Sequence, residues 1–269
     1  MVKDVLNMFW FYSKTSFKSR LQFKADAIMS AIGLFVREAA NIVVIYFTLL
    51  KFDQINGWNI NEMMFLFSLL FITYALLVIF FAGLRDFTYR IEDGAFDRMI
   101  TRPRGVLFQL MSVNSDWIAA IGHGSLGIIL FILTASKVGI IWDVKTIVYY
   151  IFAIIGGVLI QGAIFLFTAS LNFFFVKVDS IRAIFYWNMK KFAGYPISIY
   201  NKVIQGILIY VVPFAFVNYF PCQYLLRKDD MSQYPEFYMY ISPLVGVVLY
   251  LLSYVFWRFS IRFYKSTGN

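Results

Sequence analysis

The sequence predicts an all-α integral membrane protein with six transmembrane helices and both termini in the cytoplasm. Hydrophobic residues make up 61% of the 269 residues and charged residues only 14%, whereas soluble domains are about half apolar and a quarter charged. Six apolar segments are long enough to cross a bilayer, and lysine and arginine gather in alternate loops. We expect the whole chain, residues 1–269, to form a single transmembrane domain.

Each predicted span is close to the ~20 residues that cross the hydrocarbon core as a helix. The third span could begin as early as Val106, because residues 106–113 are mostly apolar. Pro213 should kink the fifth span unless neighbouring helices accept the freed carbonyl group. The six predicted spans are 29–50, 62–84, 114–136, 147–172, 203–221 and 239–257.

The distribution of basic residues gives the orientation. Seventeen of the 24 lysines and arginines lie in segments 1–24, 85–105, 176–191 and 258–269. Only five lie in the alternate segments 51–61, 137–146 and 222–238. Basic loops stay in the cytoplasm, so both termini are predicted to lie there. This pattern also accounts for the net charge of +9, and no nucleic-acid partner is expected.

Two segments outside the spans have the composition of helices that lie on a membrane surface. In the N-terminal segment, 1–28, apolar residues recur roughly at helical spacing among lysines, which predicts an interfacial amphipathic helix. The alternative is a solvated, partly ordered tail. Segment 176–202 mixes apolar and basic residues in a similar way, and it predicts a second cytoplasmic amphipathic helix that ends near Pro196.

The polar segment 85–105 differs from every other loop. It holds five arginines, four acidic residues and one proline. Phe96, Met99 and Ile100 share one helical face by their spacing, and Pro103 disfavours helix at the residue before it. The spacing predicts a short amphipathic helix, whose apolar face either lies in a groove on a partner protein or rests on the membrane.

Signatures of catalysis are missing from the sequence. The chain has no GxxxxGK[ST] phosphate-binding loop, no HExxH motif and no GxSxG motif. Its one cysteine, Cys222, excludes an intrachain disulfide framework, and its one histidine, His123, leaves little room for histidine-based catalysis. We therefore expect no enzyme activity, and no cofactor or metal bound by this chain.

Three stretches carry a resemblance to a known family. Residues 91–98 (IEDGAFDR), followed by 100–103 (ITRP), are similar to the I-x-x-G-x-[LF]-D-x-x-[LI]-x-R-P run of type-2 ATP-binding-cassette (ABC-2) exporter permeases. Residues 195–200 (YPISIY) and 212–221 (VPFAFVNYFP) resemble other recurring stretches of that family. The order of the stretches and the six-span layout agree as well, so the resemblance covers nearly the whole chain.

The resemblance implies a half-transporter in the plasma membrane of a bacterial cell. Two such permease subunits, identical or related, would form the pathway, and each would dock a separate ATPase that binds ATP and Mg²⁺. The implied cargo is an amphipathic drug, a lipid-like molecule or an antimicrobial peptide. Phe96 stands where leucine is commoner in the family. The docking residues carried over are Glu92, Asp93, Gly94, Phe96, Asp97, Arg98, Arg102 and Pro103.

A few polar residues lie inside the predicted spans. Arg37 and Glu38 are costly there, and neighbouring positions on a helix point about 100° apart, so each is expected to need its own partner. They are candidates for the pathway or a subunit interface, or for a structural ion pair. His123 lies among glycines and is expected to pack between helices or, alternatively, to relay protons. Gln161 is a further candidate for the pathway or for a hydrogen bond between helices.

A different class of protein, a secondary transporter or channel that acts alone, remains open. Such carriers often show a repeat pair, broken helices in corresponding positions and buried acidic residues. None of these is evident in the sequence. Copurification with a soluble ATPase would distinguish the two classes.

Overall fold

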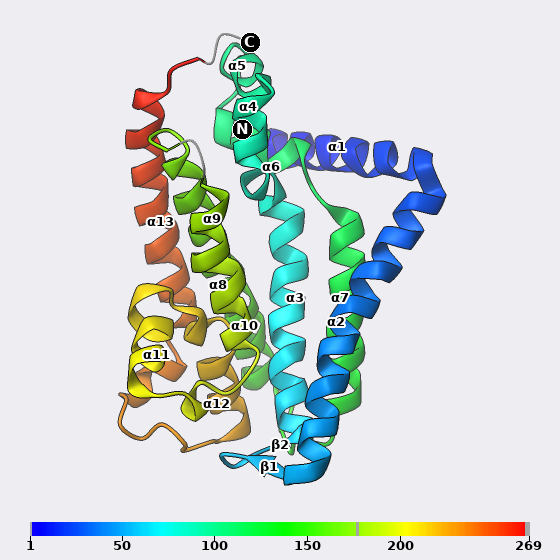
Figure 1. The fold of residues 1–269 in the computed structure, drawn as a ribbon, viewed down its shortest axis with the longest axis vertical. Helices are drawn as coiled ribbons and strands as arrows, with labels where there is room; N and C mark the ends of the chain where they lie inside the picture. Colours follow the sequence, from blue (N-terminus) through cyan, green and yellow to red (C-terminus); the bar gives the residue numbers. More distant parts are fainter. Residues whose placement is uncertain (1, 176–177, 267–269) are drawn as a thin grey trace.

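The computed structural model describes residues 2–175 and 178–266, which form helices joined by short loops and one small hairpin (Figure 1). Parts of the predicted segments 1–28 and 176–202 therefore lie outside the described residues. The first half of the chain contains α1 Val2–Arg20, a 3₁₀ turn Leu21–Phe23, α2 Lys24–Phe52, β1 Gln54–Ile55, β2 Trp58–Asn59, α3 Ile60–Arg85, α4 Phe87–Glu92, α5 Ala95–Ile100, α6 Val106–Val113 and α7 Trp117–Thr134.

The second half begins with another long helix and then breaks into short pieces. It contains α8 Val144–Leu171, α9 Asp179–Arg182, a π-helical turn Ala183–Asn188, α10 Met189–Ala193, a 3₁₀ turn Ile197–Ile199, α11 Lys202–Gly206, a π-helical turn Ile207–Val211, a 3₁₀ turn Phe214–Phe216, α12 Tyr219–Leu226, a 3₁₀ turn Glu236–Met239, α13 Ser242–Ser260 and a 3₁₀ turn Ile261–Phe263.

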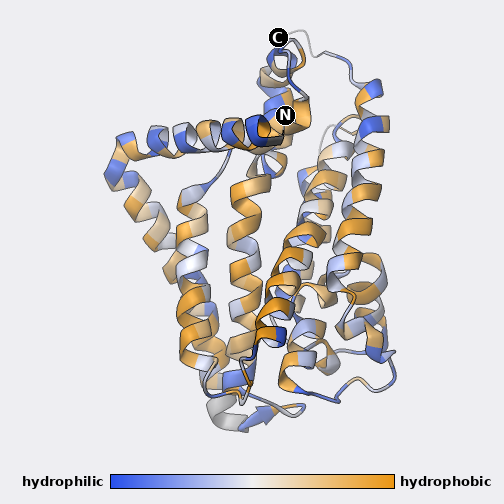
Figure 2. Ribbon diagram, turned by 180° about the vertical axis from the view of Figure 1, so that it is seen from behind, coloured by the Kyte–Doolittle hydropathy of each residue, from blue (hydrophilic) through white to orange (hydrophobic). Residues whose placement is uncertain are grey.

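The long helices run side by side as a bundle. Five helices of the described chain are long and apolar enough to cross a membrane, or six spans if the bent pair 202–226 counts as one. Apolar residues dominate along the long helices, and polar residues gather at the two ends (Figure 2). Both ends of the chain lie at the end of the bundle that carries α4 and α5, opposite the β-hairpin (Figure 1). The protein is thus an all-α, multi-pass membrane protein.

Helix α3 forms the centre of the bundle. It is apolar all round and mostly buried, as expected of a helix with neighbours on every side. It packs against α7, α8 and α6. Asn59 and Glu62 form a capping box at its first turn, where each side chain accepts the other residue's backbone N–H. This cap fixes where α3 leaves the hairpin.

Glycines allow the helices to approach closely. A Cβ atom at Gly122 would lie 2.9 Å from the backbone oxygen of Ala31 in α2, and one at Gly127 would lie 3.0 Å from Ile72 in α3. Helix α7 is therefore held between α2 and α3, as the glycine-rich sequence around His123 predicts. Gly156 makes a similar contact between α8 and α13, where a Cβ would lie 2.8 Å from the backbone of Ser242.

Helix α1 crosses the end of the bundle at a steep angle to the long helices (Figure 1). The ring of Phe9 stacks on Phe80 with centroids 5.4 Å apart. The indole N–H of Trp117 donates to the Ser13 hydroxyl over 2.8 Å. The predicted N-terminal helix is thus present and packed against the bundle, and its place on the membrane surface stays a prediction.

Segment 176–202 differs from the prediction of a surface helix. Helices α9 and α10, with the π-helical turn between them, run down into the bundle alongside α8 (Figure 1). Tyr186 is fully buried and donates to Gln161 near the middle of α8. The mixed apolar and basic pattern arises because Arg182 and Lys190 turn toward buried partners inside the protein rather than toward water.

The predicted fifth span, 203–221, is not a single helix. The chain bends by 76° between residues 202–211 and 214–226, and the break falls at Pro213, where a kink was predicted. Val212 leaves helical geometry immediately before the proline, as its position requires. Residues 202–226 thus form a bent pair of helices, a broken span or a re-entrant element, at the end of the bundle that carries the hairpin.

Candidate functional site

The predicted loop helix is two short helices joined by a tight turn. Gly94 sits between α4 and α5 with φ of +68°, a conformation that strains any residue with a Cβ. The Asp93 carboxylate accepts the backbone N–H of Ala95 over 2.8 Å and so caps α5. Helix α5 ends at Ile100, three residues before Pro103. Residues 106–113 form the separate helix α6 instead of extending the third span.

The inner face of this element is anchored in the permease itself. The ring of Phe96 is fully buried, with centroids 5.1 Å from Phe87, 5.7 Å from Phe173 and 4.6 Å from Tyr264. Met99 is buried beside it. Phe96 and Met99, two of the three residues of the predicted apolar face, are therefore covered by this chain's own α4, the turn after α8 and the C-terminal segment, whereas Ile100 is 45% exposed.

Asp97 holds the C-terminal segment in place. Its two carboxylate oxygens accept hydrogen bonds from the hydroxyls of Tyr264 and Ser266, each over 2.9 Å. Burial, together with the neighbouring Asp97 carboxylate, raises the pKa of Tyr264 to about 12, so the hydroxyl stays protonated and able to donate at neutral pH.

The outer face of α4 and α5 is exposed and charged. Of the eight residues that the family resemblance assigns to docking, Gly94 and Phe96 are buried and Asp97 is partly buried. The side chains of Tyr89 and Ile100, which that set omits, are 67% and 45% exposed. The docking residues that face solvent are Glu92, Asp93, Arg98, Arg102 and Pro103.

A polar junction ties this element to the long helices. Arg85, the last residue of α3, pairs with Asp116 at the start of α7 over 3.0 Å and with Asp86 over 2.8 Å. The buried Arg182 of α9 donates to the backbone carbonyl of Arg85 and to the Thr88 hydroxyl, and it pairs with Asp179. Arg90 of α4 donates to Asn114, which follows α6. These bonds join α4 to α9 and to the residue after α6, and they join the end of α3 to α7 and α9.

Sequence reasoning had placed Arg182 on a surface helix. A single sequence does not separate a buried arginine in a segment of apolar and basic residues from an arginine on an interfacial helix.

The second candidate site is a groove of about 700 Å³ within the bundle, lined by residues of α2, α3 and the segment around α10. Glu38 and Arg37 do pair, contrary to the expectation from their helical positions. The Arg37 side chain folds back, with Nη2 2.8 Å and Nε 3.2 Å from the carboxylate. His123 lies behind Glu38, with Nε2 3.4 Å from Oε1. Lys190 reaches the same groove from α10, with its ammonium 3.5 Å from the ring centre of Tyr74.

Gln161 lies elsewhere. Its side chain is fully buried, and its amide donates to Thr73 over 3.0 Å while its carbonyl accepts from Tyr186 over 2.7 Å. These bonds join α8 to α3 and to the 183–188 turn. The structure thus brings Arg37, Glu38 and His123 together, and it assigns Gln161 to a bond between helices away from the groove.

The comparison with known families agrees with this layout. A family model described as ABC-2 family transporter protein matches residues 35–268. The chain belongs to the ABC-2 transporter family. Comparisons with curated proteins and with solved structures gave no match.

Membership fixes the general role of the chain. An ABC-2 permease is the membrane component of an ABC transporter and works with an ATPase subunit, so this chain is not itself the ATPase. Within residues 2–175 and 178–266, no cluster of His, Cys, Asp and Glu has the arrangement to hold a metal ion.

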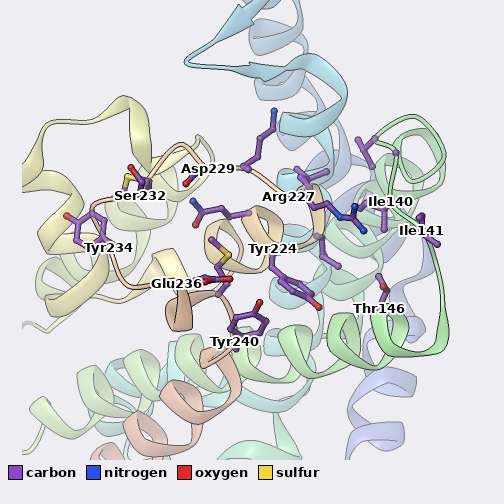
Figure 3. Close-up of a pocket in the computed structure, with 18 of the residues that line it drawn as sticks. Ile140, Ile141, Thr146, Tyr224, Arg227, Asp229, Ser232, Tyr234, Glu236 and Tyr240 are labelled. Carbon is purple, nitrogen blue, oxygen red and sulfur yellow. The ribbon is translucent and has the colours of Figure 1, made fainter.

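The far end of this ABC-2 permease carries a second cavity, of about 820 Å³, between the loop after α7 and the segment that follows α12 (Figure 3). Asp230 secures the nearby hairpin, because its carboxylate accepts from Trp58 and Ser198, each over 2.6 Å. Charges of both signs line the cavity, including Arg227 and Glu236. This mixture favours no single class of ligand.

Proposed function

We propose that this chain is the permease subunit of an ATP-driven exporter. Two permease subunits enclose the pathway, and each docks a separate ATPase through the exposed face of α4 and α5. The cargo is an amphipathic drug, a lipid-like molecule or a peptide antimicrobial compound. The complex lies in the plasma membrane of a bacterial cell, with both termini of this chain in the cytoplasm.

One observation carries the proposal: one side of the α4–α5 element is anchored in the permease and the other side is exposed. Its inner side is fixed by Phe96 and Asp97, while its outer side presents Tyr89, Arg98 and Arg102 to solvent. An exposed aromatic ring flanked by charges has the composition of a protein-binding surface. A docking surface that must pull on the permease also needs a rigid anchor, and this element has one.

The mechanism follows from that anchoring. ATP bound by the partner, with Mg²⁺, draws two ATPase subunits together and shifts the docked elements. The junction at Arg85 and Arg182 passes this displacement to α3, α7 and α9. ATP acts only through the difference in stability between two arrangements of the bundle.

Copurification from the native membrane tests the proposal. Tagged wild-type chain is expected to recover a soluble ATPase, and the double variant Arg98→Glu with Arg102→Glu is expected to lose it at equal membrane abundance. Lys145→Glu reverses an exposed charge at the opposite end of α8 and serves as the matched control. Phe96 and Asp97 are unsuitable here, because changes at these anchored residues would disturb the permease itself.

Recovery of no ATPase with the wild-type chain would favour the alternative, a secondary transporter or channel that acts alone. Equal recovery with the double variant would show that docking uses a different surface.

A further inference from the structure

The groove between α2, α3 and α10 lies at mid-depth in the bundle. Glu38 is near the middle of α2, and Phe71 is near the middle of α3. Its volume of about 700 Å³ is within the range of pockets that hold drug-sized molecules. Apolar rings line it together with charged groups, principally Phe67, Phe71, Trp187, Arg37, Glu38 and Lys190.

Lys190 is the unusual member of this set. Its ammonium lies 3.5 Å from the ring centre of Tyr74, and 6.0 and 5.9 Å from those of Phe71 and Trp187. Within the described part of the chain, no carboxylate lies within 4 Å of this ammonium. Aromatic faces stabilise a cation only in part, and an ionisable residue within a membrane is costly and usually serves a function.

Glu38 is the one acidic residue lining the groove, and it is already engaged. Arg37 donates to it twice. On its other side, Nδ1 of His123 lies 2.9 Å from the carbonyl oxygen of Ala119, which can only accept, so Nδ1 carries a hydrogen. Nε2 of His123 lies 3.4 Å from the Glu38 carboxylate, so that carboxylate has Arg37 on one side and His123 on the other.

The groove is therefore positively charged. Arg37 offsets the charge of Glu38, with which it pairs over 2.8 Å, so the remaining charged groups lining the groove are Lys190 and Lys191, both cations. The Arg37 side chain is 62% exposed, and Lys191 is exposed as well, so both are accessible to an approaching anion.

We infer that this groove binds an amphipathic anion, with the negative group at Lys190 and the apolar body along Phe67, Phe71 and Trp187. This inference rests on the proposed export function and narrows its cargo to molecules that carry both an acidic group and an apolar body. Cationic amphiphiles are disfavoured because Lys190 would repel them.

The test compares two probes that differ only in charge: dansyl-labelled undecanoic acid and its primary amide. Their binding is measured by fluorescence titration with the full-length permease in phosphatidylcholine nanodiscs. Wild type is expected to bind the acid about tenfold or more tightly than the amide, and Lys190→Gln is expected to remove that preference. Lys190→Arg should restore it, and Lys145→Gln, outside the groove, should leave it unchanged.

Equal affinity of the wild-type chain for acid and amide would overturn the inference, as would an unchanged preference in Lys190→Gln. The amide also reports folding, because a folded Lys190→Gln variant keeps the wild-type affinity for it.

Adding phosphatidylglycerol distinguishes the source of the anion. Displacement of the acid that depends on Lys190 identifies a lipid headgroup, and no displacement identifies a free amphiphile. The assay contains no ATPase, so its outcome is independent of the copurification experiment.

Discussion

Charged groups occur both in the junction around Arg85 and Arg182 and in the groove, but they are arranged in opposite ways. At the junction, Arg85 and Arg182 are each held by several partners from different helices. In the groove, the Lys190 ammonium lies against aromatic rings, and no carboxylate of residues 2–175 and 178–266 lies within 4 Å of it. Saturated polar networks make a structure rigid, whereas an unsatisfied buried charge costs stability.

The difference separates two tasks within one bundle. A junction that transmits movement needs several bonds that hold the helices as a unit. A groove that binds and releases cargo needs a group whose partner is supplied by the cargo. The charge that lowers stability is thus expected at the binding site, and the charges that raise it at the junction.

Arg182→Met tests the junction with the largest expected effect. The buried Thr88 hydroxyl and the carbonyl oxygen of Arg85 each lose a donor, at about 1–3 kcal/mol apiece, whereas the 68% exposed Asp179 carboxylate returns to water. The free energy of unfolding is obtained from denaturant titration of detergent-solubilised protein, followed by tryptophan fluorescence. A change below about 1 kcal/mol would contradict a buried junction held by several bonds, since exposed pairs cost no more than that.

Phe96→Ala tests the anchoring of the docking element. The fully buried ring packs among three aromatic neighbours, so its removal is expected to cost about 3 kcal/mol. Ile100→Ala, on the same helix but 45% exposed, provides the control and should cost less than about 1 kcal/mol. Similar losses for the two variants would show that the inner face is not anchored as described.

Gln161→Leu tests an uncharged polar side chain within the bundle that has hydrogen-bond partners on two other segments. The change leaves the buried hydroxyls of Tyr186 and Thr73 without this partner, at a cost of about 1–3 kcal/mol in the same titration. Adding Tyr186→Phe should recover part of the loss, because the hydroxyl that lost its acceptor is then gone. A double variant less stable than Gln161→Leu alone would argue against this account.

Lys190→Met has the smallest expected effect on stability. The loss of cation–π contacts is offset by the removal of an unpaired charge from the bundle. The free energy of unfolding should therefore fall by about 1 kcal/mol or less, or rise. The thermal midpoint, read from the reaction of the buried thiol of Cys222 with a fluorogenic reagent, gives a second measure. A destabilisation equal to that of Arg182→Met would remove the distinction between the two sites.

Composition and length predicted most of the fold. The apolar segments 62–84 and 147–172 became α3 and α8, and Pro103 marked the end of the loop helix, because proline restricts the backbone of the residue before it. The sequence predicted one helix in segment 85–105, whereas the structure has two, α4 and α5, divided at Gly94. The residue pattern of 176–202 could not reveal its depth, since basic residues on an apolar helix look alike whether they meet water or a buried partner. The burial of Phe96 and the surroundings of Lys190 could not be predicted either, because both depend on contacts between segments far apart in the sequence.

The most direct test of the account measures ATP hydrolysis and efflux together, using the permease and its copurified ATPase in liposomes. Thr88→Val combined with Asp179→Asn weakens the hold of α9 on α4 without touching the exposed docking face or the groove. Thr15→Val, on the exposed side of α1, is the control. We predict continued hydrolysis with a fall of about tenfold in molecules transported per ATP. An unchanged ratio would contradict the claim that the junction carries movement from the docking element to the groove.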